Sequence, residues 1–137
     1  MVSGGQISSI QSHWNSKVKP NMQAVGNALF VKYFTKNPGD QAHFKKFAGV
    51  GVGDLPGNAA FNAQTLVVLE FLDKLVAGLG SNAGDLMAAQ KAPHTARGVG
   101  MPEFKRMFDF IPGFMAENGG DADAWKAACG ALEAALK

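Results

Sequence analysis

Cysteine is almost absent from this sequence, which contains only Cys129. A single thiol cannot form an internal disulfide, and it cannot build a cysteine-based zinc or iron–sulfur site. A free thiol suits the reducing interior of a cell. We therefore expect a cytoplasmic protein.

Long apolar runs and clustered charge are missing as well. The longest apolar stretch, Leu66–Leu72, contains Glu70 and is far shorter than the ~20 residues of a membrane span. The N-terminal residues MVSGGQISSI have neither the basic start nor the apolar segment of a secretory signal. The 13 basic and 11 acidic residues are scattered and leave a net charge of +2. We therefore expect no membrane span and no nucleic-acid partner.

A nucleotide-binding loop is also absent. The glycine-rich stretch AGVGVGDLPGN indicates a loop, but no Gly-Lys-Ser/Thr closes it and no strand precedes it. What the chain does contain is typical of a globular protein, with 47% apolar and 18% charged residues. Chains of roughly 50–200 residues fold around one core, so we expect residues 1–137 to form a single domain.

Apolar residues recur every three or four positions through most of the chain, whereas no segment alternates with period two. Ser3-Gly4-Gly5-Gln6 has the form of a capping box, and the helix behind it is expected to end before Pro20. Further helices are expected over residues 22–36, 59–79 (capped by Asn58 and ended by Gly80), 85–93, 102 onward and 122–136. The sequence therefore predicts an all-α fold.

His94 is the residue with the clearest chemical potential. It lies between two helical patterns, close to Arg97 and ahead of an apolar run. A neutral imidazole can bind a metal through one nitrogen and donate a hydrogen bond from the other. A single histidine is more often an ordinary surface or core residue, so ligation depends on the rest of the chain. We expect His13 and His43 at the surface.

The order of the predicted elements resembles the globin family over nearly the whole chain. The residues that carry this resemblance are Trp14, Phe34-x-x-x-Pro38, Phe44, Phe47, Gln64, Val68, His94, Phe104 and Met107. The chain looks most like small intracellular or nerve globins of invertebrates, and HTARG, PGFM and GGDADAW are similar to segments of molluscan haemoglobins. The resemblance implies a globin fold of six to eight helices that encloses a haem.

The resemblance also implies a role for each residue of a haem site. His94 stands at the position of the proximal iron ligand, and Gln64, one turn before Val68, stands at the position of the distal residue beside bound gas. The implied cofactor is haem b, iron protoporphyrin IX. Implied haem contacts are Phe44, Phe47, Val68, Leu72, Arg97, Val99, Phe104 and Met107, and the implied distal ligand pocket comprises Gln64, Phe30 and Val68.

Two positions beside His94 depart from the common family pattern. Pro93 stands where many globins carry a hydroxyl residue that orients the imidazole, and Gln90 stands where a leucine is common. The other ring nitrogen of His94 is expected to donate to a backbone carbonyl about one turn earlier, at Ala89 or Gln90. Arg97 is either the partner of a haem propionate or a solvated surface charge.

Gln64 determines which function we expect. An amide can donate a hydrogen bond to bound dioxygen, but it cannot shuttle protons because it does not titrate. We therefore expect reversible binding of dioxygen for intracellular storage or transport, with CO and NO as further ligands. We expect no enzymatic activity beyond a weak peroxidase-type side reaction.

Three alternatives stay open at the level of sequence. Peroxidase or dehaloperoxidase-type activity, which some invertebrate globins show, needs a titrating distal residue. Sulfide binding is favoured by Gln64, Phe30 and Phe44, which are similar to the distal cage of a sulfide-reactive globin, although Val68 is smaller than the phenylalanine found there. A helical interaction module without haem is the third alternative. Both a monomer and a homo-oligomer are compatible with the sequence.

Overall fold

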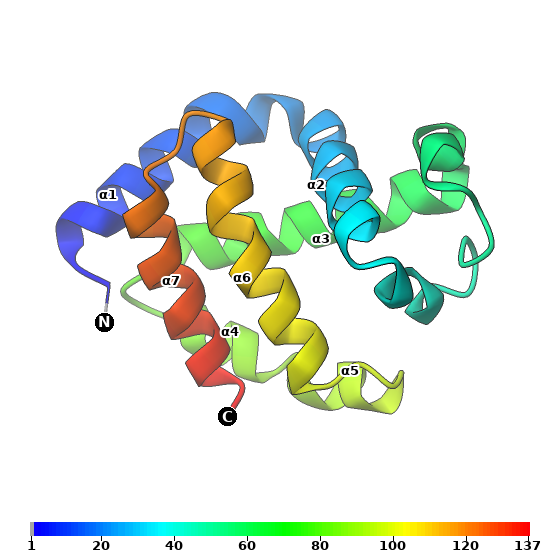
Figure 1. The fold of residues 1–137 in the computed structure, drawn as a ribbon. Coiled ribbons are helices and arrows are strands. Elements are labelled where there is room, and N and C mark those ends of the chain that lie inside the picture. The colour runs from blue at the N-terminus through cyan, green and yellow to red at the C-terminus, as the bar shows by residue number, and fades with distance from the viewer. Residues whose placement is uncertain (1) are drawn as a thin grey trace.

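The computed structural model describes residues 2–137, and none of these residues belongs to a β-strand (Figure 1). The predicted all-α fold is therefore confirmed. The α-helices of this part of the chain are α1 Gly4–His13, α2 Met22–Lys36, α3 Ala59–Ala77, α4 Ala83–Ala88, α5 Lys91–Ala96, α6 Met101–Glu117 and α7 Ala122–Ala135. Shorter π- and 3-10-helical segments join them: η1 Trp14–Val18, η2 Lys19–Asn21, η3 Pro38–His43 and η4 Val52–Gly57.

Side-chain caps fix where several helices begin. Ser3 and Gln6 form the predicted capping box, in which the Gln6 amide donates to Ser3 Oγ over 3.1 Å and the Ser3 amide to Gln6 Oε1 over 2.9 Å. Asn58 Oδ1 accepts from the Phe61 amide over 3.0 Å at the start of α3, and Asp121 caps α7. Each cap satisfies amides that have no partner inside their helix, so these predicted starts are confirmed.

The helix predicted over residues 85–93 is instead divided between two short helices. Residues 89 and 90 separate α4 from α5, and His94 lies within α5. Pro93 explains the break, because a proline in the middle of a long helix removes a backbone hydrogen bond. As the third residue of a new helix, Pro93 gives up only an amide that would have no intrahelical partner. The helix predicted to reach Leu79 also ends earlier, at Ala77.

The long helices pack in pairs (Figure 1). Helices α6 and α7 lie side by side, α2 crosses α3, and α1 and α4 both contact α7. The crossing of α2 and α3 is close at Gly26, where an added Cβ would lie 2.9 Å from Leu69 Cδ2. A larger residue at position 26 would therefore push the two helices apart. Within residues 2–137, none of the helices combines the length and apolar character needed to span a bilayer.

His13 lies in the core, so its predicted place at the surface is wrong. Its side chain is buried where α1 meets α7. Its Nε2 donates to the backbone oxygen of Asn118 over 2.9 Å, and its Nδ1 accepts from Trp125 Nε1 over 3.2 Å. A carbonyl only accepts and an indole only donates, so Nε2 is the donor and Nδ1 the acceptor in these two bonds. His43 is half-buried, with Nε2 3.6 Å from Glu103 Oε1.

Candidate functional site

His94 is half-buried on α5, and one of its two ring nitrogens is held by the preceding turn. Nδ1 lies 2.7 Å from the backbone oxygen of Gln90, so Nδ1 carries the proton and donates it. This bond was predicted for Ala89 or Gln90, and Gln90 is confirmed. Among residues 2–137 no hydrogen bond engages Nε2. The lone pair of Nε2 is therefore available to a metal.

The surroundings of His94 favour its neutral form. Burial lowers the pKa of the imidazole below its ordinary value, the hydrogen bond to Gln90 raises it, and the positive charge of Arg97 lowers it. Together these effects lower the pKa of His94. A metal binds the neutral imidazole, so the protonation state favoured here is the one that ligation needs.

Phe104 and Val99 lie beside His94. The rings of His94 and Phe104 have centroids 4.9 Å apart and planes inclined by 54°. The Val99 amide donates to the His94 carbonyl over 2.8 Å. Phe104 lies in the first turn of α6, where Glu103 Oε2 accepts from the Gly100 amide over 3.0 Å. The structure therefore brings His94, Val99 and Phe104 together.

Phe30, Phe44 and Phe47 form a second group. The rings of Phe44 and Phe47 stack with centroids 5.3 Å apart, and Phe30 meets the edge of Phe44 at 6.4 Å. Phe34 supports this group, with its ring centroid 5.6 Å from Phe30 and 5.7 Å from Phe44. The sequence identified Phe34 only as part of the spacing to Pro38, and the structure adds it as the support for the other rings.

Helix α3 presents two different faces. Thr65 and Leu69 are fully buried on the face that packs against α2. On the neighbouring face, Gln64 and Val68 are one turn apart and only half-buried. Within the described residues, the side-chain amide of Gln64 has no hydrogen-bond partner, whereas the nearby Asn62 and Thr65 side chains are bonded to Asn27 of α2. This second face therefore offers a free donor beside an apolar side chain.

Six apolar side chains at positions predicted for haem contact are half-buried and would be covered by a flat apolar ligand. They come from the segment after η3, from one face of α3, and from the α5–α6 junction. The members of this set are Phe44, Val68, Leu72, Val99, Phe104 and Met107. Exposed apolar surface costs about 25 cal/mol per Å² relative to burial, so covering these side chains is favourable. A haem is such a ligand, because it is a flat apolar ring that accepts an axial nitrogen.

No group of three or more His, Cys, Asp or Glu side chains in residues 2–137 could hold a metal ion by itself. A tetrapyrrole ring, the cofactor that the resemblance implies, would supply further ligands to an iron bound by His94. Arg97 is exposed at the end of α5, and its Nε donates to the Pro93 carbonyl over 3.1 Å. Its role toward a propionate stays a prediction.

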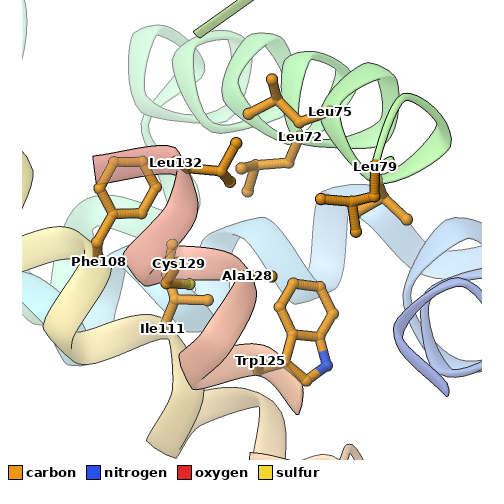
Figure 2. Close-up of a pocket in the computed structure, with 10 residues that line it drawn as sticks. Leu72, Leu75, Leu79, Phe108, Ile111, Trp125, Ala128, Cys129 and Leu132 are labelled. Atoms are coloured by element: carbon orange, nitrogen blue, oxygen red, sulfur yellow. The ribbon is translucent and has the colours of Figure 1, made fainter. Parts of the chain in front are cut away.

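A small apolar cavity lies between α3, α6 and α7 (Figure 2). Its volume of about 20 Å³ accommodates one water-sized molecule. Leu72, predicted to contact haem, lines it together with Phe108 and Leu132. Cys129 lies on its wall, where burial, followed by the negative charges of Asp109 and Glu133, raises the pKa of the thiol to about 12. The thiol is therefore inert at neutral pH.

Comparisons with known proteins indicate the family and the fold of the chain. The family model described as Globin matches residues 27–136. Myoglobin from Scomber japonicus is 32% identical over 103 residues, which cover 75% of this chain and 70% of that protein. A globin from Aequiyoldia eightsii is 30% identical over 132 residues, which cover 91% and 89% of the two chains. The structure of a double mutant of myoglobin from Aplysia limacina superposes with a TM-score of 0.88 at 22% identity, covering 99% of this chain and 97% of that one.

Proposed function

The chain belongs to the globin family, and we propose that it binds haem b and uses it to hold dioxygen reversibly for storage or transport inside a cell. When bound, the haem supplies an iron atom at which dioxygen, CO or NO can bind and leave. The observation that carries this proposal is the geometry of His94, whose Nδ1 is held by Gln90 while Nε2 is free.

His94 is the proposed proximal ligand. Its bond to the Gln90 carbonyl fixes the tautomer and the rotation of the ring, and it raises the basicity of Nε2. The ring of Phe104 limits tilting from one side. Pro93 does not weaken this arrangement, because the accepting carbonyl belongs to Gln90 rather than to the side chain at position 93.

Gln64 is the proposed distal donor. Its free amide can give one hydrogen bond to a gas molecule that gains negative charge at the site, which stabilises that ligand by about 1.5–3 kcal/mol. An amide does not titrate, so Gln64 cannot relay the protons that peroxide cleavage needs. We therefore propose a carrier, with peroxidase-type turnover only as a slow side reaction.

Apolar side chains on either side of the ring would hold the haem and limit water. Phe30 and Phe44 meet edge to face, and on the distal side they would form an apolar wall of the kind that keeps protons and water away from bound gas. Further proposed haem contacts are Phe47, Val68, Leu72, Val99, Phe104 and Met107. Arg97 keeps its terminal nitrogens for a propionate at the exposed edge, because only its Nε is bonded to Pro93.

Optical spectra test the proposal. We expect the chain reconstituted with haem to give separate deoxy, oxy and carbonyl spectra. His94→Gly should lose the deoxy spectrum of the parent, and added imidazole should restore it by filling the space of the missing ring. Thr95→Gly, at the exposed neighbouring position of α5, controls for the flexibility that glycine adds. Spectra of His94→Gly equal to those of the parent, or no haem band in the parent, would refute the proposal.

A further inference from the structure

A charged cluster outside the candidate haem site joins three elements of the fold. Asp40 of η3 is buried, and it accepts hydrogen bonds from the Tyr33 hydroxyl of α2 and from Arg106 of α6. Arg106 binds it through two nitrogens, with Nε 2.8 Å from Oδ2 and Nη2 2.6 Å from Oδ1. The Arg106 guanidinium holds the pKa of Asp40 below its ordinary value, so the carboxylate is charged at neutral pH.

A second, looser contact joins the same two elements one turn later in η3 and one turn earlier in α6. His43 lies 3.6 Å from Glu103, in the last residue of η3 and the first turn of α6. Glu103 also closes the N-terminus of α6 through the Gly100 amide. The segment η3 is therefore tied to the part of α6 that carries Phe104 against His94.

Phe44 follows η3 directly and depends on it for its position. The Phe44 amide donates to the Gln41 carbonyl over 3.0 Å. The Gln41 side chain is buried, and its Nε2 donates over 2.8 Å to the carbonyls of both Phe47 and Val50. Asp40 and Gln41 are adjacent, so one is anchored on α2 and α6 while the other holds the turn that follows Phe44. The residues of that turn are not in a regular helix.

Net stability alone does not explain this ion pair, in which the Asp40 carboxylate is buried and the Arg106 side chain is 41% exposed. Removing a carboxylate from water costs free energy that the attraction of a partly solvated guanidinium offsets only in part. What an ion pair with two parallel hydrogen bonds adds is a fixed distance and orientation. Here the fixed distance lies between Arg106, two residues after Phe104 on α6, and Asp40, four residues before Phe44.

We propose that Asp40 and Arg106 are positioning residues that hold Phe44 over the face where gas binds. This rests on the proposed function, because Phe44 needs a ligand site to act on. The rates at which gas enters and leaves then depend on an ion pair that never touches the gas. Losing the pair loosens the turn from Phe44 to Val50, and the ring no longer keeps one position.

The test compares Asp40→Asn with Lys32→Gln in the full chain. Asparagine keeps the shape and one acceptor for Tyr33 but loses the charge that Arg106 binds. Lys32 is the matched control, because its 2.9 Å pair with Glu117 also joins α2 to α6, but at an exposed place. Arg106→Lys is a second variant, which keeps the charge and loses the two-nitrogen geometry.

Hydrogen exchange is the measurement that does not depend on haem. In Asp40→Asn we expect the amides of Phe44, Phe47 and Val50 to exchange about tenfold faster, while those of α7 keep the rates of the parent. Arg106→Lys should act in the same direction, and Lys32→Gln should change none of these amides. Equal acceleration of every amide, or none at all, would show that the pair only adds stability or adds nothing, and either result overturns the proposal.

With haem bound, the same variants are compared by flash photolysis of CO and by the infrared C–O stretch. We expect the CO rebinding rate of Asp40→Asn to change at least threefold and its C–O band to broaden, because Phe44 takes several positions. Rates and a band equal to those of the parent would overturn the link to gas binding. If the parent binds no haem, the proposed function fails, and the exchange measurement still decides whether Asp40 holds Phe44.

Discussion

Two regions of the molecule differ in how completely the ring nitrogens of their histidines are hydrogen-bonded. Where α1 meets α7, His13 is buried and both of its ring nitrogens are bonded, one to Asn118 and one to Trp125. On α5, His94 is half-buried and only its Nδ1 is bonded. Both histidines lie against aromatic rings and donate to a carbonyl. The candidate ligand His94 therefore differs from the core residue His13 in having one ring nitrogen, Nε2, without a hydrogen bond.

Helix α3 repeats this contrast between neighbouring residues. Thr65 faces α2, where its Oγ1 donates to Asn27 over 2.7 Å and accepts from Gln23 over 3.0 Å. Gln64, the preceding residue, turns to the other face and keeps its amide free within the described residues. One face of the helix therefore serves folding, and the next is available to a ligand.

The largest effect should come from making the same substitution at both histidines. His13→Leu leaves the Trp125 N–H and the Asn118 carbonyl without partners, so we expect the free energy of unfolding to fall by about 2–4 kcal/mol. His94→Leu removes one bond from a half-buried ring and should cost less than about 1 kcal/mol in the haem-free chain. Urea denaturation followed by far-ultraviolet circular dichroism measures both. Equal losses at the two positions would remove the distinction between the regions.

The two faces of α3 should separate function from stability. Gln64→Leu removes the proposed donor, and we expect dioxygen to dissociate about 10–100 times faster with little change in stability. Thr65→Val breaks the bonds to α2, and it should lower the free energy of unfolding by about 1–3 kcal/mol without changing that rate. Stopped-flow displacement of dioxygen and urea denaturation make the comparison. Sulfide binding, the alternative function, is tested by measuring how fast sulfide dissociates from the ferric parent and from ferric Gln64→Leu. Slow dissociation from the parent but not from Gln64→Leu would favour sulfide binding.

Local chemistry explains which parts of the fold could be predicted. Ser3, Asn58 and Asp121 cap helices through atoms within three residues, so the sequence itself contains both partners of each bond. The break between α4 and α5 was missed because apolar spacing continues across it. Pro93 contained the signal, since a proline is better tolerated in a first turn than in the middle of a helix.

The features that could not be predicted depend on contacts between residues far apart in the sequence. His13 and Trp125 are 112 positions apart, and Asp40 and Arg106 are 66 apart. Nothing in the local pattern around His13 distinguishes a buried ring from an exposed one. The candidate site was predicted by resemblance, from the spacings of His94, Phe104 and Gln64, and the roles of these residues stay predictions. The free nitrogen of His94 and the support given by Phe34 needed coordinates.

Substitution of Cys129 should change the free energy of unfolding least, and it tests how well solvent is excluded from the side chains of α7. Cys129→Ala enlarges the cavity beside Leu72 slightly, so at neutral pH we expect a loss of about 1 kcal/mol in the free energy of unfolding. Burial raises the pKa of the thiol from 9.0 to about 12, so the folded chain keeps a proton that the unfolded chain releases. The contribution of the protonated thiol to the free energy of unfolding is complete below pH 9 and is lost as the pH rises toward 12.

The parent should therefore lose stability above pH 9 relative to Cys129→Ala, and the order of the two proteins should reverse within that range. Groups that both proteins share cancel in the difference. Urea denaturation of both proteins at pH 7 and at about pH 10 measures it. If the difference in the free energy of unfolding between the two proteins is the same at both pH values, solvent reaches the thiol. The side chains of α7 would then be no better protected from solvent than those of α5.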